Sequence, residues 1–340
     1  MVGLDASDLT PGAAQAVSLC GVIVSFAEAA EEVLSRLAGL HVSEATAQRT
    51  TEAAGHDLGR RLEAGTTFGP ARDWAWHTDA QGKTCAYVSL DATSVPQQGP
   101  RAAKADGRMA TVAMIYNPIP EDRARWAHPA GKRPPWQARY QASLQGQATL
   151  GEPLRRQGAQ VGMDRAERWI AISDGGAGLE DWLTTHFGRV EAVILDFYHA
   201  SEHLGDLAKV WHGAGTEAAE AQHDRWSHRL KHEGGGAVLA ELRALEVGSR
   251  PSAREVWRET ITYFENQVHR MDYPSYVAKG WQIGSGPVES ACKTVVGQRL
   301  KCAGMRWREQ GSDGVCHLRA LFLSEKGQWD AFWARPRKAG

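Results

Sequence analysis

Three carboxylate side chains stand at the predicted ends of two strands and at the start of a predicted helix. Asp91 ends the apolar segment 84–91, and Asp174 ends the apolar segment 169–174. Glu289 follows a Gly-Ser-Gly turn and falls in the first turn of a predicted helix. Carboxylate oxygens suit Mg²⁺ or Mn²⁺, and three carboxylates offset the charge of two such ions. Such a site would cleave phosphodiester bonds, with one ion activating a water or a 3′-hydroxyl and the other stabilising the leaving oxygen.

Each carboxylate alone also has a structural explanation. An aspartate at a strand end is a common turn former, and a glutamate in the first turn of a helix interacts favourably with the helix dipole. The metal-site interpretation therefore depends on whether the fold brings the three side chains together.

A second arrangement of chemical interest is His199-Ala-Ser-Glu202-His203, which matches the H-x-x-E-H pattern of inverted zinc peptidases. That pattern needs both histidines on one helix face and a third ligand downstream, for which the sequence offers only loosely placed glutamates. His199 directly follows a predicted strand that ends in Asp196, so we expect it at a strand–helix junction. The short pattern also arises by chance, and we keep the zinc peptidase as a minor alternative.

The elements that would position these residues read as three strands, a helix, a strand, a helix and a strand. Their ranges are 84–91, 110–116, 139–144, 153–165, 169–174, 179–187 and 191–196. This order predicts an α/β fold, with a mixed sheet and helices on its faces, as in the ribonuclease H fold. In that topology the first and fourth strands are neighbours, which would bring Asp91 close to Asp174.

Helical patterns surround this core. Residues 26–37 predict a helix, residues 38–42 a glycine turn, and Ser43 the N-cap of a second helix, which is a helix-turn-helix outline that could contact DNA. Residues 117–136 read as a loop rich in proline and arginine. The predicted domains are a helical region 1–70, a catalytic core 80–199, a helical insertion 200–280, and final helices with a basic segment 281–335.

Charge and cysteine usage limit the class of protein. The net charge is −1, but the chain from Lys293 onward holds ten Lys or Arg against four Asp or Glu. That segment suits a polyanion, and Arg299, Lys301, Arg306 and Arg308 are the candidate phosphate contacts, although a solvated helix face explains it equally well. The five cysteines form no C-x-x-C pair, which excludes a cysteine zinc module and fits a reducing cytosol. The apolar run 13–26 follows acidic residues, so we expect no signal peptide or membrane span.

Three motifs carry a resemblance to a known family: residues 172–179 (ISDGGAGL), 195–204 (LDFYHASEHL) and 284–290 (GSGPVES). With them the chain resembles bacterial insertion-sequence transposases of the ISKra type, which have a ribonuclease H-like DDE domain allied to Mutator-like and hAT transposases. The resemblance extends from the helical N-terminal region to about Trp333. It implies Mg²⁺-dependent cleavage at transposon ends and strand transfer into target DNA, with two Mg²⁺ (or Mn²⁺) ions as cofactors.

The resemblance also implies roles for single residues. Asp91, Asp174 and Glu289 would be the catalytic triad and the metal ligands. The family's C/D-x-x-H signature falls on Asp196 and His199, so His199 would support the site, and Asp196 rivals Asp174 for the second ligand position. The partners would be the terminal inverted repeats and target DNA, with no membrane. The protein would act as a homo-oligomer on DNA in the bacterial cytoplasm, associated with the nucleoid.

One departure from the family keeps a second hypothesis open. Members usually carry a further N-terminal DNA-binding module, often with zinc-binding cysteines, and this sequence has none. A truncated or catalytically incompetent transposase would then act only as a DNA-binding protein, through residues 25–60 and the basic segment.

Overall fold

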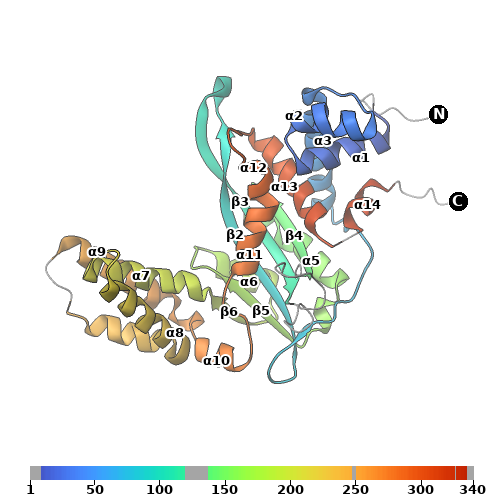
Figure 1. The fold of residues 1–340 in the computed structure, drawn as a ribbon. Coiled ribbons are helices and arrows are strands. Elements are labelled where there is room, and N and C mark those ends of the chain that lie inside the picture. The colour runs from blue at the N-terminus through green and yellow to red at the C-terminus, as the bar shows by residue number, and fades with distance from the viewer. Residues whose placement is uncertain (1–8, 119–136, 247–249, 326, 335–340) are drawn as a thin grey trace. The chain divides into compact units, whose positions relative to one another are not determined.

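A computed structural model describes residues 9–118, 137–246, 250–325 and 327–334. Within these ranges the chain is an α/β protein with a mixed, open sheet of six strands and many helices (Figure 1). The strand order is β4-β3-β2-β5-β6, and β1 pairs with β2. Contacts divide the chain into unit 1, with residues 1–75, 90–165 and 287–340, and unit 2, with residues 76–89 and 166–286. The predicted 1–70 region and most of the 281–335 segment thus belong to one unit.

The predicted strands are all present. They are β2 (Thr84–Gln98), β3 (Lys104–Asn117), β4 (Gln137–Ser143), β5 (Arg168–Ser173) and β6 (Val190–Leu195), joined by the short β1 (His77–Thr78). β5 pairs parallel with β2 on one side and with β6 on the other, whereas β3 and β4 pair antiparallel. β5 is buried along nearly its whole length, as expected of a parallel strand covered on both faces.

β2 and β3 are longer than predicted. Both continue beyond the buried sheet as a ribbon that turns through the short helix η2 (Pro100–Ala102). Residues 91–98 are mostly polar and residues 105–109 are mostly exposed, so these parts lack the apolar pattern that identified the inner part of each strand. Of the predicted 117–136 loop, residues 119–136 lie outside the described residues.

Unit 1 joins helices from the two ends of the chain. The N-terminal helices are α1 (Pro11–Ile23), α2 (Phe26–Glu28), the π-helical η1 (Ala29–Ala38) and α3 (Glu44–Glu63), and the C-terminal ones are α13 (Glu309–Leu323) and α14 (Gln328–Trp333). Leu58 and Leu62 of α3 share a buried cluster with Leu318, Trp329 and Phe332. α3 and α13 cross at Gly55 and Gly314, where a Cβ on Gly55 would collide with the Gly314 backbone.

Besides β3, β4 and the outer part of β2, unit 1 has further helices. They are α5 (Gly151–Gln160), η3 (Gln147–Thr149), η4 (Met163–Arg165), and the run α11 (Gly286–Ala291), η6 (Cys292–Gly297) and α12 (Gln298–Leu300). This run agrees with the helix predicted over 287–301. Its middle is a π-helical segment, which nothing in the apolar pattern indicated.

Unit 2 holds β5, β6, the first part of β2 and a group of helices. The helices are α6 (Leu179–His186), α7 (Phe197–His212), α8 (Glu217–Ala244), α9 (Pro251–Gln267), η5 (Val268–Arg270) and α10 (Tyr273–Ala278). α7, α8 and α9 pack on one another around Trp226, which is fully buried and donates from Nε1 to Glu241 at 3.0 Å (Figure 1). The predicted glycine interruption at 234–236 is a kink within α8, where Gly234 has a φ of 85°.

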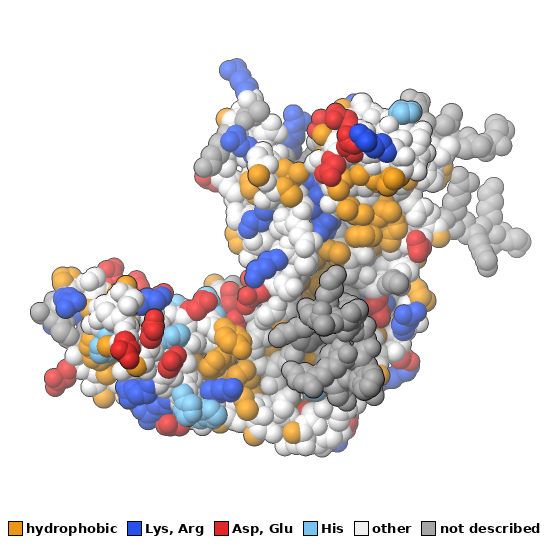
Figure 2. All heavy atoms as spheres, in the orientation of Figure 1, with side chains coloured by type: hydrophobic (Ala, Val, Ile, Leu, Met, Phe, Trp, Pro, Cys, Tyr) orange, Lys and Arg blue, Asp and Glu red, His pale blue; other side chains and the backbone are white. Residues whose placement is uncertain are grey.

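On the face shown in Figure 2, acidic, basic and histidine side chains are interspersed over the surface where Figure 1 places α7, α8 and α9. That face of the helical insertion therefore carries no patch of a single charge. No helix within the described ranges has both the length and the apolar character needed to cross a membrane.

Candidate functional site

The ends of two parallel strands bring Asp174 and Asp196 together in unit 2. β5 and β6 pair in register up to Ser173 and Leu195, and each aspartate is the next residue. The Asp196 amide continues this pairing, because it donates to the Ser173 carbonyl at 2.9 Å. Both carboxylates therefore lie at the carboxyl edge of the sheet, where the fold order predicted the second metal ligand.

The two aspartates differ in their exposure and in the hydrogen bonds that their carboxylates accept from the protein. Asp196 is only 3% exposed and caps α7: its Oδ1 accepts from the Tyr198 amide at 3.0 Å, and its Oδ2 accepts from Ser285 Oγ at 2.7 Å. Asp174 is partly exposed, and its Oδ1 accepts from the Gly176 amide at 3.0 Å. Because both Asp196 oxygens are engaged by the protein, the geometry favours Asp174 as the ligand for a cation.

A buried arginine, absent from the sequence-based candidates, supports this edge of the sheet. Arg270 is 2% exposed and donates from Nη2 to Ser173 Oγ at 2.7 Å and to the Ser173 carbonyl at 3.1 Å. It also donates to the carbonyls of Asp174 at 3.3 Å and Val193 at 3.3 Å. Burial lowers the pKa of Arg270, with the nearby Glu180 opposing that shift. Only the tertiary fold reveals this role, because a lone arginine after a helix carries no sequence signal.

The histidines of the H-x-x-E-H stretch face an aromatic ring. α7 begins at Phe197, so His199 lies in its first turn, as the predicted strand–helix junction requires. His199 Nδ1 lies 3.5 Å from Glu202 Oε2, and the His203 ring stacks on Tyr263 with 3.9 Å between centroids. Burial, and then the charge of His199, lower the pKa of His203.

Among the described residues, no three His, Cys, Asp or Glu side chains already have the spacing of a metal site. This holds for the zinc-peptidase set and for the carboxylate set alike, so it does not distinguish between the two hypotheses.

The other two predicted catalytic carboxylates, Asp91 and Glu289, both lie in unit 1. Asp91 is partly exposed on β2, and its Oδ1 accepts from the Ala92 amide at 2.6 Å. Glu289 is exposed in α11, one helical turn before the buried Cys292. Burial raises the pKa of the Cys292 thiol. The charge of Asp91, a hydrogen bond between the thiol and Asp91, and the charge of Glu289 each raise that pKa further. Glu289 lies three residues before Cys292 in one helical run, so the contact that folding adds at this thiol is the one from Asp91.

The predicted helix-turn-helix and the predicted basic segment both lie within the described residues. η1 ends at Gly39, which has a φ of 61°, and Ser43 Oγ accepts from the Thr46 amide at 3.1 Å at the start of α3. The predicted helix, glycine turn and capped second helix are therefore confirmed as structure. Lys301, Arg306 and Arg308 are exposed, and Lys301 Nζ donates to Thr93 Oγ1 at 3.1 Å.

Arg299 corrects the predicted phosphate-contact set. It is 1% exposed and its guanidinium lies between the rings of Phe26, at 4.6 Å, and Trp307, at 4.9 Å. Nε donates to the Gly21 carbonyl at 2.8 Å. Burial, and then the charge of Arg319, lower its pKa to about 10. Arg299 therefore joins α1 to the C-terminal segment and does not form part of an exposed phosphate-binding surface.

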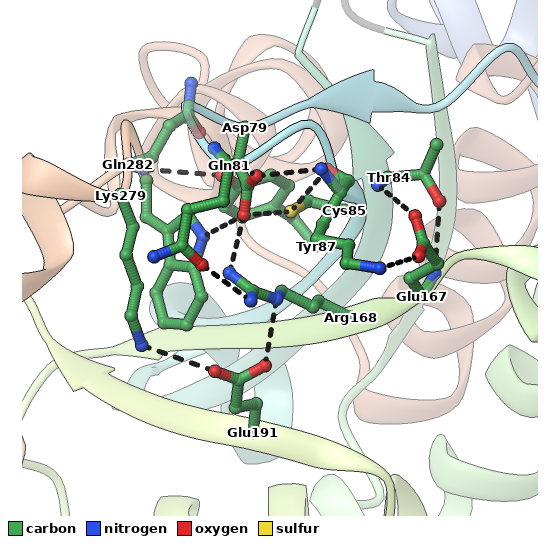
Figure 3. Close-up of polar contacts among 12 residues, drawn as sticks. Asp79, Gln81, Thr84, Cys85, Tyr87, Glu167, Arg168, Glu191, Lys279 and Gln282 are labelled. Carbon is green, nitrogen blue, oxygen red and sulfur yellow. Dashed lines mark hydrogen bonds and ion pairs between the residues drawn. The ribbon is translucent and has the colours of Figure 1, made fainter.

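No sequence pattern indicated the polar network around Asp79 in unit 2 (Figure 3). The buried Asp79 carboxylate accepts from the amides of Gln81 and Lys83, both at 2.9 Å, from Arg168 Nη1 at 2.8 Å and from Trp281 Nε1 at 3.1 Å. Burial opposes ionisation, but these donors outweigh it and lower the pKa of Asp79 to about 2. The network fixes Trp281, at the start of the segment 281–286 that leads into α11.

The chain matches no protein-family model and no curated protein.

Proposed function

We propose that this chain is a DDE transposase that cleaves DNA at transposon ends and transfers the freed 3′-hydroxyls to target DNA. The observation that supports this proposal is the hydrogen bond between Asp91 and the Cys292 thiol, which joins Asp91 of β2 to the helical run that also carries Glu289. Glu289 is exposed and Asp91 is partly exposed, so solvent reaches both carboxylates.

Asp174 is the proposed second carboxylate. It follows β5, which ends at Ser173, and it stands in the motif 172–179 that resembles the family's. On that resemblance we propose Asp91, Asp174 and Glu289 as the catalytic carboxylates of a ribonuclease H-like active site.

The chemistry of the donors fits Mg²⁺ or Mn²⁺. All three side chains offer only oxygen, which hard divalent cations prefer. When bound, two such ions would supply the activation of a water or 3′-hydroxyl and the stabilisation of the leaving oxygen. Asp196 and His199 would support the site from the start of α7. The proposal further includes action in the bacterial cytoplasm on nucleoid DNA, as a homo-oligomer on paired ends.

The test uses the full chain, Mg²⁺, and a linear DNA that carries the gene with its native flanks. Asp91→Asn, Asp174→Asn and Glu289→Gln should each lower end cleavage about a thousandfold or more. DNA binding in EDTA should survive in all three, and Asp181→Asn, on an exposed helix of unit 2, should cleave normally.

Two outcomes would contradict the proposal. Normal cleavage by the Asp174→Asn protein would remove Asp174 from the site. Metal-independent DNA binding by the unaltered chain, without any cleavage or strand transfer, would leave only the DNA-binding hypothesis. A stoichiometric zinc ion retained by the purified protein and lost with His203→Ala would revive the peptidase alternative.

A further inference from the structure

His203, the second histidine of the H-x-x-E-H stretch, belongs to a cluster of three rings in unit 2. Its ring stacks on Tyr263 of α9, with 3.9 Å between the centroids and 30° between the planes. The ring of His199 meets both of them at a steep angle, at 5.3 Å from His203 and 6.0 Å from Tyr263. The two histidines of α7 therefore hold one tyrosine of α9 in place.

The Tyr263 ring also packs against the turn that follows Asp174. A Cβ atom added to Gly175 would lie 2.6 Å from Tyr263 Cε2 and 3.0 Å from the hydroxyl oxygen, so a larger residue would push the ring away. A second residue of α9 supports the same turn, because Gln267 Nε2 donates to the Gly175 carbonyl at 3.5 Å. The backbone next to Asp174 is therefore in direct contact with α9.

The Tyr263 hydroxyl is buried and has no hydrogen-bond partner among the described residues. A buried tyrosine hydroxyl usually finds a partner, because leaving it unpaired costs free energy. Phenylalanine would fill the same space without that cost. Burial raises the pKa of this hydroxyl; the charge of Arg270 opposes the shift, and the charges of Asp174 and Asp196 increase it. The hydroxyl therefore stays protonated, as a hydrogen-bond donor near two carboxylates.

We propose that Tyr263 is a positioning residue for Asp174, and that its hydroxyl donates a hydrogen bond to the Asp174 carboxylate when that carboxylate binds a divalent cation. This inference rests on the proposed function. A carboxylate that binds a metal ion is commonly held by a hydrogen bond from a neighbouring donor, which fixes its orientation. The bond requires the partly exposed Asp174 side chain to turn toward Tyr263, away from the Gly176 amide from which its Oδ1 accepts.

This role gives the H-x-x-E-H stretch a function that needs no zinc. His203 acts through its ring, by stacking on Tyr263, and not through a metal-binding nitrogen. An unpaired buried hydroxyl that reduces stability fits this role, since functional sites often keep groups that cost stability.

The test compares the unaltered full chain with Tyr263→Phe, which removes only the hydroxyl. Mn²⁺ binding, followed by electron paramagnetic resonance without DNA, should weaken about tenfold, because a hydrogen bond to a metal-binding group is lost. In EDTA the midpoint of urea unfolding should instead rise, because an unpaired buried hydroxyl has been removed. A residue with only a structural role would not combine higher stability with weaker Mn²⁺ binding.

Further variants separate the hydroxyl from the stacked rings. His203→Ala should weaken Mn²⁺ binding, and His203→Phe, which restores a stacking ring without a metal-binding nitrogen, should recover most of it. Ser18→Ala is the matched control for stability, because Ser18 Oγ in α1 is also buried without a partner among the described residues. It should raise the urea midpoint and leave Mn²⁺ binding unchanged.

The outcomes distinguish this inference from the proposed active site. Unchanged Mn²⁺ binding in Tyr263→Phe, with weaker binding in Asp174→Asn, would overturn the inference and leave the proposed site in place. Unchanged binding in Asp174→Asn would remove both. A lower urea midpoint for Tyr263→Phe in EDTA would also overturn the inference, because the hydroxyl would then have a partner before any ion binds. A His203→Phe protein as weak in Mn²⁺ binding as His203→Ala would overturn the stacking role of His203.

Discussion

Asp196 Oδ2 accepts a hydrogen bond from Ser285 Oγ at 2.7 Å, and this bond joins the start of α7 to the segment that leads into α11. The Phe197 amide strengthens the junction by donating to the Ile283 carbonyl at 2.9 Å. The next helix in the chain carries Glu289. These two bonds attach the segment 283–285 to the start of α7, so Asp196 helps to fix the position of that segment.

Ser285→Ala tests this role. It should reduce cleavage about tenfold and stability by about 1–2 kcal/mol, because a buried hydrogen bond to a charged acceptor is lost. Mn²⁺ binding, followed by electron paramagnetic resonance, should weaken only slightly in this variant, through displacement of Glu289, but strongly in Asp174→Asn. Strong Mn²⁺ binding in Asp174→Asn together with its loss in Asp196→Asn would instead place Asp196 on the metal.

Arg270→Gln should unfold at a lower urea concentration, with a loss of about 3 kcal/mol. The glutamine is too short to reach the carbonyls of Ser173, Asp174 and Val193, which then stay buried without a donor. Arg258→Gln, on the exposed side of α9, should change stability by no more than about 0.5 kcal/mol. Equal effects of the two substitutions would show that the strand ends do not depend on Arg270.

The ionisation of Asp79 should make the free energy of unfolding depend on pH in the acidic range. Its pKa falls from 3.8 to about 2 on folding, so its contribution is present above pH 3.8 and is lost as the pH falls toward 2. The contribution is about 2 kcal/mol. Urea unfolding across this window should therefore show a smaller loss of stability in Asp79→Asn than in the unaltered chain. A parallel loss in both proteins would mean that another group causes the acid sensitivity.

Gly55→Ala should destabilise the chain by about 1–3 kcal/mol, because the new Cβ meets the Gly314 backbone and α3 must move away from α13. Gly12→Ala, in the first turn of α1, has open space around its Cβ and should be neutral or slightly stabilising. Thermal unfolding of the two variants gives the comparison. A stable Gly55→Ala protein would show that the two helices tolerate a wider separation.

The inner parts of the strands and the carboxylates at their ends were predictable from sequence. Ile170–Ile172 and Val193–Leu195 are apolar runs bounded by Asp174 and Asp196, and burial on both faces of a parallel sheet requires that local pattern. The capped turn from Gly39 to Ser43 was predictable for a similar reason, since a positive φ and an N-cap each depend on one nearby residue.

Only the tertiary structure distinguished residues of the same type in different surroundings. Arg299 and Arg306 look alike in a basic segment, but one lies between two rings and the other is exposed. Asp174 and Asp196 both end strands, yet Ser285, far along the chain, engages only Asp196. Local sequence patterns indicate the hydrophobic periodicity and the capping residues of a helix or strand. The burial of a side chain, its hydrogen-bond partners and the charges around it depend on residues that folding brings from distant parts of the sequence.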